Sequence, residues 1–258
     1  MTAEESPGTV LSSQNGRIRT ILLSNPRKLN SISGEMADLL AQELKKAESD
    51  PNTRVVILRG HGDNYSSGAD LTKFETGNRN KALEFRKSMN SVVITMNSMK
   101  KPILAVLHGY SLGGGLEIAE SADIRIAGSS AKIGQPEIKI GINAGAGGNV
   151  ILPKLIGRGR ALYLMLTGQI ITAKQAMDWG LVDLVFGDEE LFSKAQEIAE
   201  NIAGMPEETV SICKRLVYES QNLNIEDALQ RESEGFADLF TSQETMKRIE
   251  KFLHRQVK

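Results

Sequence analysis

Residues 108–117, HGYSLGGGLE, contain two overlapping patterns that predict different chemistry. Residues 109–113 match G-x-S-x-G, the turn that presents a serine nucleophile in many hydrolases. The three glycines that follow, and then Glu117, stand where a helix could begin, and backbone N–H groups at such a place can stabilise an oxygen that gains negative charge. The first pattern makes Ser111 the reactive group, whereas the second gives that role to the glycines.

The sequence lacks a suitable histidine partner for a serine nucleophile at Ser111. In that architecture an acid and then a histidine follow the serine in the chain, and the only histidine after Ser111 is His254. His254 lies in the charged stretch KRIEKFLHRQ, which is typical of a solvated helix face. Dinucleotide and P-loop glycine motifs also fail, because residue 118 is isoleucine and no G-x-x-x-x-G-K is present. Hydrolysis through Ser111 is therefore a remote alternative.

A second loop, residues 65–71 (YSSGADL), follows the apolar run 54–59 in the way that the glycines follow the run 103–107. Both runs predict buried strands, and neighbouring parallel strands place the loops that follow them at one edge of the sheet. We expect backbone N–H groups from the two loops to converge there. Such a pair stabilises a carbonyl oxygen that becomes anionic.

Glu117 and Glu137 stand close to this predicted edge. Two carboxyl groups beside an oxyanion site could divide a proton-transfer task between them. Each also has a structural alternative: Glu117 as an acid stabilised at a helix N-terminus, and Glu137 as a surface carboxylate in a turn.

The elements that must position these groups alternate between strand and helix. Strands are predicted at 17–23, 54–59, 103–107 and 122–127, and helices at about 33–49 and 79–98. This order predicts an α/β fold with right-handed crossovers. We expect a mobile lead-in at 1–8, an α/β core at 9–188 and a helical subdomain at 189–258, which could pack on the core or on a neighbouring subunit.

Composition excludes several classes of protein. The 258 residues carry a net charge of −1 without a long basic run, so nucleic acid is not an expected partner. No apolar run is long enough for a membrane span, and no signal peptide is recognisable. The single cysteine, Cys213, predicts reducing conditions, a cytoplasmic location and a buried, structural thiol. The three histidines are too dispersed to predict a metal site.

Six segments together resemble the crotonase, or enoyl-CoA hydratase/isomerase, superfamily, and most closely its enoyl-CoA hydratases. The resemblance covers nearly the whole chain and rests on NPRKLNS, SSGADL, KKPILAVLHGYSLGGGLEIAESADIRIA, IGQPEIKIGINAGAGG, LPKLIGR and LTGQIITAKQAMDWGLVDLV. It implies a crotonase-like spiral core of ββα turns with a helical C-terminal trimerisation region. It also implies a homo-oligomer, a trimer or a hexamer built as a dimer of trimers.

The resemblance implies an acyl-CoA thioester held by the N–H groups of Ala69 and Gly114. Glu117 and Glu137 would activate water and transfer protons, with Glu117 assigned to the water and Glu137 to the α carbon. Ser111 would be an accidental match whose hydroxyl bonds locally to backbone. CoA is then part of the substrate, and no separate cofactor or metal is expected. The substrate-binding residues implied are Arg27 or Lys28 at the phosphates, and Ser67, Ala69, Asp70, Leu71, Thr72 and Gly114.

Two departures from the family pattern concern the acyl group. Ala144 replaces a proline, and residues 149–151 (NVI) replace a more polar sequence, both at positions expected to lie near the acyl chain. Three interpretations therefore stay open: a hydratase of 2-enoyl-CoA, an isomerase or other crotonase-type enzyme of acyl-CoA thioesters, and a non-catalytic oligomeric binding protein.

Overall fold

The computed structural model describes residues 8–255, so residues 1–7 of the predicted lead-in lie outside the described part. The strands are β1 Thr9–Asn15, β2 Ile18–Ser24, β3 Val55–Gly60, β4 Ile103–Leu107, β5 Tyr110–Leu112, β6 Ile124–Gly128, β7 Lys132–Gly134, β8 Ile170–Thr172 and β9 Leu184–Phe186. The α-helices are α1 Gly34–Ser49, α2 Arg79–Ser98, α3 Gly114–Glu120, α4 Gly148–Ile156, α5 Arg158–Thr167, α6 Ala173–Trp179, α7 Leu191–Ala203, α8 Glu207–Ser220, α9 Ile225–Phe240 and α10 Gln243–Arg255. Short 3₁₀ turns are η1 Pro26–Lys28, η2 Leu71–Lys73 and η3 Pro136–Ile140.

The main sheet of the described chain has the order β1-β2-β3-β4-β6-β9. All its pairs are parallel except β1 with β2, which form an antiparallel hairpin. The predicted α/β class and the four predicted strands are confirmed. Strand β1 was not predicted, because it is an edge strand whose side chains are almost all exposed and show no apolar pattern.

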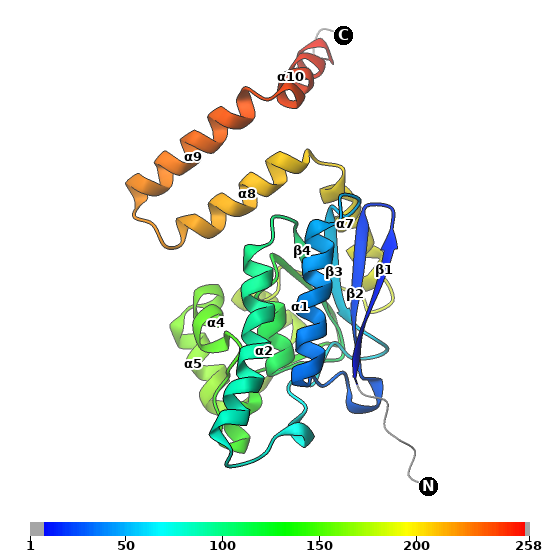
Figure 1. Ribbon diagram of the computed structural model, residues 1–258, viewed down its shortest axis with the longest axis vertical. Helices are drawn as coiled ribbons and strands as arrows, with labels where there is room; N and C mark the ends of the chain where they lie inside the picture. Colours follow the sequence, from blue (N-terminus) through cyan, green and yellow to red (C-terminus); the bar gives the residue numbers. More distant parts are fainter. Residues whose placement is uncertain (1–7, 256–258) are drawn as a thin grey trace.

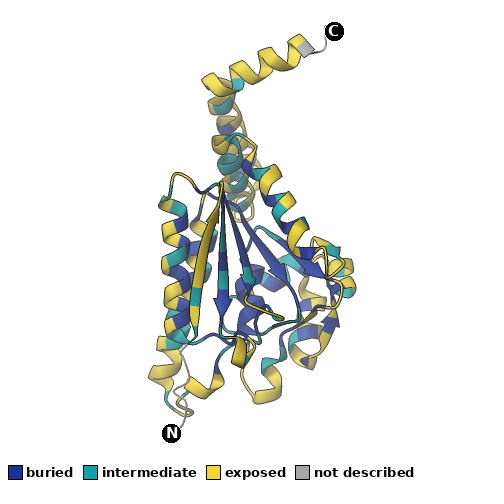
Figure 2. Cartoon of the chain, turned by 90° about the vertical axis from the view of Figure 1, so that its right-hand side faces the viewer, coloured by how far each residue is buried: buried dark blue, intermediate teal, exposed yellow. Residues whose placement is uncertain are grey.

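Both faces of this sheet are covered, which explains why its central strands lack polar alternation. Val56 and Leu58 of β3 belong to the core beneath α1 and α2, whereas Val55 and Ile57 pack in the core beneath α7. Figure 1 shows α1 and α2 on the near face of the sheet, and Figure 2 shows the strands as the most buried part of the chain. Helices on both faces are the usual consequence of parallel crossovers.

A second sheet, of order β5-β7-β8, follows the glycine-rich segment. Strand β5 pairs in parallel with β7, and β7 pairs antiparallel with β8. Because α3 begins directly after β5 and η3 begins directly after β7, this pairing places the start of α3 beside η3. The small sheet therefore brings together two segments that carry the predicted carboxylates.

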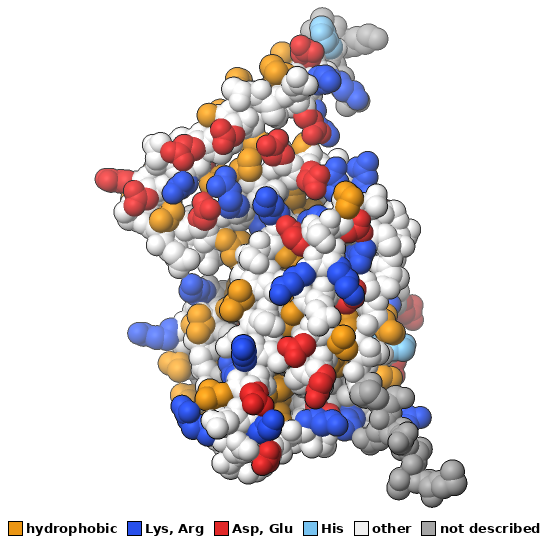
Figure 3. Space-filling model, in the orientation of Figure 1, with side chains coloured by type: hydrophobic (Ala, Val, Ile, Leu, Met, Phe, Trp, Pro, Cys, Tyr) orange, Lys and Arg blue, Asp and Glu red, His pale blue; other side chains and the backbone are white. Residues whose placement is uncertain are grey.

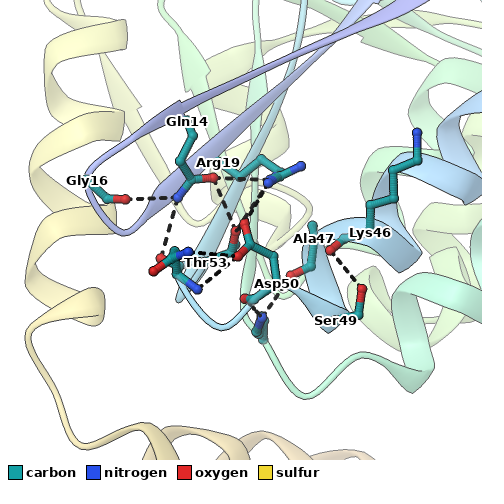
Figure 4. Close-up of polar contacts among 10 residues, drawn as sticks. Gln14, Gly16, Arg19, Lys46, Ala47, Ser49, Asp50 and Thr53 are labelled. Carbon is teal, nitrogen blue, oxygen red and sulfur yellow. Dashed lines mark hydrogen bonds and ion pairs between the residues drawn. The ribbon is translucent and has the colours of Figure 1, made fainter.

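Polar side chains join the end of α1 to the β1–β2 hairpin (Figure 4). Oδ2 of Asp50 accepts hydrogen bonds from Nη2 of Arg19 at 2.7 Å and from Oγ1 of Thr53 at 3.1 Å. Gln14 in β1 accepts from the same two side chains at 3.1 and 3.2 Å. The helix ends at Ser49 with Asp50 as its C-cap, which agrees with the predicted helix at about 33–49.

The last three helices, α8 to α10, lie outside the main body of the protein, and most of their residues are exposed (Figures 1 and 2). This placement corrects the expectation for Cys213 in α8, because its side chain is exposed and not buried. No helix within residues 8–255 is long and apolar enough to cross a bilayer. Basic and acidic side chains are intermixed over the face shown in Figure 3.

Helix α8 is attached to the core through Lys214. Its Nζ lies 2.8 Å from Oδ2 of Asp123 and donates to the carbonyl of Lys101 at 3.1 Å. Only 8% of the Lys214 side chain and 14% of the Asp123 side chain are exposed. We therefore expect Lys214→Met to lower the free energy of unfolding by about 2 kcal/mol, because the half-buried Asp123 carboxylate loses its cation. Urea unfolding at neutral pH measures this loss.

The matched control is Lys194→Met in α7. Lys194 pairs with Glu197 one turn away at 2.8 Å, but both side chains are largely exposed. Solvent screening should leave the urea midpoint of this variant close to that of the wild type. Equal losses in the two variants would show that the contact between α8 and the core does not depend on this buried pair.

Candidate active site

Ala69 and Gly114, whose backbone N–H groups the sequence predicts to converge, both line one cavity of about 340 Å³. Within residues 8–255, neither group has a hydrogen-bond acceptor. Ala69 lies in the loop after β3, and Gly114 begins α3 after β5. Because β3 and β4 pair in parallel, the loops that follow them leave the same edge of the sheet, as predicted.

The local pairing explains why Ala69 has a free N–H. Gly68 accepts a hydrogen bond from the N–H of Ile32 at 2.8 Å, and Asp70 donates to the carbonyl of Ile32 at 2.8 Å. Ala69 is the residue between these two bonds, and in a parallel bridge its own N–H points to the opposite side. A buried serine hydroxyl, Oγ of Ser66, accepts from the N–H of Gly68 at 3.1 Å and fixes the turn.

Gly114 lies in contact with the loop that carries Ala69. A Cβ atom at this position would lie 3.2 Å from the methyl carbon of Met89 and 3.6 Å from the backbone nitrogen of Ala69. The same Cβ would lie 3.8 Å from Oε2 of Glu117. A side chain at residue 114 would therefore occupy the space that the two N–H groups share, which is a physical reason for glycine here.

Glu117 is almost completely buried in α3, at 3% exposure. Its Oε1 accepts a hydrogen bond from the N–H of Gly148 at 2.9 Å and a second from the N–H of Ala146. Burial raises the pKa of this carboxyl group, while the backbone donors and the positive charge of Arg86 oppose the increase. One oxygen is thus held by backbone, and Oε2 lies on the side of Gly114.

Glu137 lies in η3 on the other side of the glycines. Its Oε1 is 2.8 Å from the position that a Cβ of residue 113 would take, and its Oε2 is buried without a hydrogen-bond partner among the described residues. Burial raises the pKa of Glu137 to about 7, against the effect of its own backbone N–H and with a further increase from the charge of Glu117. A carboxyl group with this pKa can donate or accept a proton near neutral pH.

The rest of the cavity is mainly apolar, with one guanidinium group in its wall. Arg86 of α2 packs against Gly145, donates to Oδ1 of Asn90 at 3.3 Å and lies close enough to Glu117 to lower the pKa of that carboxyl group. The sequence predicted a helix at 79–98 but gave no sign that Arg86 faces the site. The apolar lining consists of Leu71, Phe74, Phe85, Met89, Ile140 and Ile142.

The predicted CoA-binding residues divide into two groups. Ser67, Ala69, Leu71 and Gly114 line the cavity, whereas Arg27, Lys28, Asp70 and Thr72 do not. Nζ of Lys28 lies 3.3 Å from Oδ2 of Asp70 and 2.9 Å from Oγ1 of Thr72, so these three side chains bind one another beside the cavity. Arg27 is exposed in η1. Contact of Arg27 or Lys28 with phosphates stays a prediction.

Ala144 and residues 149–151 do not themselves line the cavity, so their expected influence on the acyl chain stays a prediction. Asn149 instead donates to the carbonyl of Ala144, within the loop that precedes α4. The nearby cavity wall is formed by Ile142, Asn143, Gly145 and Ala146.

Ser111 is fully buried in β5 and does not line the cavity. Its hydroxyl oxygen has no hydrogen-bond partner among the described residues, so the expected local bond to backbone was wrong. The nearest histidine in sequence, His108, has Nδ1 3.1 Å from the carbonyl oxygen of Val106 and Nε2 3.2 Å from that of Gly62. The nucleophile–base contact that a serine hydrolase requires is therefore absent from the described part of the chain. No cluster of potential metal ligands occurs there either.

Comparison with known proteins points to one family. The sequence profile described as "Enoyl-CoA hydratase/isomerase" matches residues 13–257. The short-chain-enoyl-CoA hydratase of Clostridium acetobutylicum is 32% identical over 248 residues, which cover 96% of this chain and 95% of that protein. The crotonyl-CoA hydratase of Syntrophomonas wolfei is 31% identical over 241 residues, with 93% of each chain covered.

Solved structures agree with the sequence comparison. The crystal structure of enoyl-CoA hydratase from Thermoplasma volcanium superposes with a TM-score of 0.89 at 46% identity, covering 94% of this chain and 96% of that one. The enoyl-CoA hydratase from Bacillus anthracis gives a TM-score of 0.92 at 30% identity, with 96% of each chain covered. The crotonase-like fold expected from the sequence is thereby confirmed. The chain belongs to the enoyl-CoA hydratase/isomerase family.

Proposed function

We propose that this protein is an enoyl-CoA hydratase, which adds water across the 2,3 double bond of a 2-enoyl-CoA thioester. The observation that carries the proposal is the pair of unbonded N–H groups of Ala69 and Gly114 in a cavity that also contains two carboxyl groups, Glu117 and Glu137. Both N–H groups would donate to the thioester oxygen. The mainly apolar walls suit an acyl chain, and they strengthen hydrogen bonds by excluding water.

The chemistry follows from where charge develops. Polarisation of the thioester C=O withdraws electrons from the conjugated double bond, so that the oxygen of water can bond to the β carbon. The former double-bond electrons move toward the carbonyl oxygen, which becomes an enolate-like anion between the two N–H groups. One carboxylate takes a proton from the water, and the other carboxyl group delivers a proton to the α carbon. The sum is the addition of one water, without a separate cofactor or metal.

The two carboxyl groups have different surroundings, which suggests a division of roles. Glu117 is held by backbone N–H groups and lies near Arg86, both of which favour its charged form. We therefore assign the removal of the water proton to Glu117. Glu137 has a pKa of about 7 and an oxygen without a partner, so it can carry the proton for the α carbon.

We also propose that the protein is a homo-oligomer, a trimer or hexamer, assembled in part through its C-terminal helices. Large apolar side chains are exposed on α9, including Ile225 at 72%, Phe236 at 66% and Phe240 at 54%. The two phenylalanine rings stack on each other with centroids 5.6 Å apart. Exposed apolar surface of this kind is typical of an interface between subunits. The cytoplasmic location stays a prediction.

Mass spectrometry after incubation with acyl-CoA thioesters tests the proposed reaction. We expect 2-enoyl-CoA substrates to gain one water and their enoyl-thioester absorbance to disappear. A mass-neutral product from a 3-enoyl-CoA, with no hydration of 2-enoyl-CoA, would instead identify an isomerase. Release of free CoA would identify a thioesterase, and unchanged substrate over the whole panel would favour a non-catalytic binding protein.

Glu117→Gln and Glu137→Gln test the carboxyl groups. Each variant should lower kcat by about 10² to 10⁴, with KM changed by less than about threefold, because the lost proton transfer acts mainly in the transition state. Steady-state kinetics with a short 2-enoyl-CoA measures both constants. The control is Ser111→Ala, which should retain most activity. Full activity in either glutamine variant would disprove the paired mechanism.

Arg86→Met tests the electrostatic role of the guanidinium group in the cavity wall. Loss of this charge should raise the pKa of Glu117 further, so the acidic limb of the kcat/KM profile should move to higher pH. The control is Arg86→Lys, which keeps the charge and should move the limb less. An unchanged profile in Arg86→Met would show that Arg86 does not act on the group that titrates in catalysis.

A further inference from the structure

Behind the cavity lies a buried pair of side chains that the proposed chemistry does not use. Glu120 follows Glu117 by about one turn of α3, and Gln135 precedes Glu137 by two residues. Glu120 is 2% exposed and Gln135 is 1% exposed. Nε2 of Gln135 donates a hydrogen bond to Oε1 of Glu120 at 2.9 Å. The pair therefore connects the helix that carries one catalytic candidate to the turn that carries the other.

The two remaining oxygens of this pair, Oε2 of Glu120 and Oε1 of Gln135, are both buried and have no partner among the described residues. If Glu120 were ionised, both atoms would be acceptors, and neither could satisfy the other. A proton on Oε2 removes the conflict, because a carboxylic acid and an amide can exchange two hydrogen bonds in a ring. One proton would thus satisfy both buried atoms, which would otherwise be costly.

We propose that Glu120 is a positioning residue, held as a neutral carboxylic acid whose Oε2–H donates to Oε1 of Gln135. The resulting two-bond pair fixes the turn that carries Glu137 relative to the helix that carries Glu117. This inference rests on the proposed hydratase function for its kinetic consequences, but the protonation of Glu120 itself can be tested without catalysis.

The charges around Glu120 agree with a neutral state. Glu117 from α3 and Glu137 from η3 both disfavour a further negative charge, and the positive charge of Arg125 from β6 opposes them. Arg125 already donates to the carbonyls of Leu181 and Ala122. Burial, the largest cause, together with these carboxylates raises the pKa of Glu120 to about 8. A neutral Glu120 also adds no negative charge beside Glu117 and Glu137.

The position of Gly148 shows how close the pair lies to the reacting groups. A Cβ at Gly148 would be 3.1 Å from Oε1 of Glu117 and 3.2 Å from Nε2 of Gln135. The Gln135 amide is therefore packed beside the backbone donor that holds Glu117. A displacement of Gln135 would move the Pro136–Glu137 turn and disturb this donor at the same time, and misplacement by about 1 Å can cost a large factor in rate.

Two variants separate a positioning role from general stabilisation of the fold. Glu120→Gln keeps the ring, because an amide can accept from Gln135 through oxygen and donate to it through nitrogen. We expect its kcat at pH 7 to stay within about threefold of the wild type. Glu120→Leu removes the ring and should lower kcat by at least about tenfold, with KM within about threefold. Full kcat in Glu120→Leu, or an equal loss in both variants, would overturn the proposal.

Unfolding as a function of pH tests the protonation state directly. The folded protein would keep a proton on Glu120 between about pH 5 and pH 8, whereas the unfolded chain releases it near the ordinary glutamate pKa of about 4.3. The wild type should therefore lose stability relative to Glu120→Gln as pH rises through this window. The ratio of their unfolding constants should change by up to about tenfold per pH unit.

The remaining carboxyl groups are the same in both proteins, so the ratio reports on residue 120. Glu232→Gln, which changes an exposed carboxylate of α9, provides a control with an expected flat ratio. A flat ratio for Glu120→Gln as well would show that Glu120 is ionised and would overturn the proposal, whether or not the protein hydrates enoyl-CoA. The protein could instead lack hydratase activity while the unfolding constant of the wild type, divided by that of Glu120→Gln, rises with pH. This result would reject the proposed function but support a protonated Glu120.

Discussion

The structure depends on keeping two backbone N–H groups without intramolecular acceptors at one point. Neither N–H group gains a hydrogen bond within the described protein, so the surrounding fold must hold the loops in place without one. The parallel pairing of β3 with β4 brings the loops to one edge, and the bridge between Ile32 and Ala69 turns one N–H away from its neighbours. Gly114 leaves the shared space open. A thioester oxygen would satisfy both donors.

The same region concentrates buried acidic groups, and their surroundings differ in a useful way. Glu117 receives backbone donors, whereas Glu137 retains an oxygen without a partner. Burial raises the pKa of both groups, and negative charge on one disfavours negative charge on the other. The two carboxyl groups together therefore favour a state in which one is protonated and the other is ionised. This state suits a reaction in which one group takes a proton from water and the other gives one to carbon.

The sequence predicted the parts of the fold that leave an unambiguous pattern. The apolar runs of β3 and β4 and the helices α1 and α2 appear where expected, because burial of strands and amphipathic faces shapes the composition directly. Strand β1 was not predicted, because an exposed edge strand needs no apolar side chains. The roles of Arg86 and Glu120 were not predicted, because they depend on which side of a helix meets the cavity or its wall. The exposure of Cys213 was not predicted, because it follows from the position of α8 outside the main core.

Infrared spectroscopy of a bound, unreactive thioester would detect hydrogen bonds from Ala69 and Gly114 to its oxygen. A saturated acyl-CoA labelled with ¹³C at the carbonyl cannot be hydrated, so its C=O stretching band reports on hydrogen bonding to the oxygen alone. The account predicts a clear shift of the band to lower frequency on binding, of similar size in the wild type and in Glu117→Gln, because Ala69 and Gly114 donate through backbone. A bound thioester whose band stays at the frequency found in an apolar solvent would contradict it.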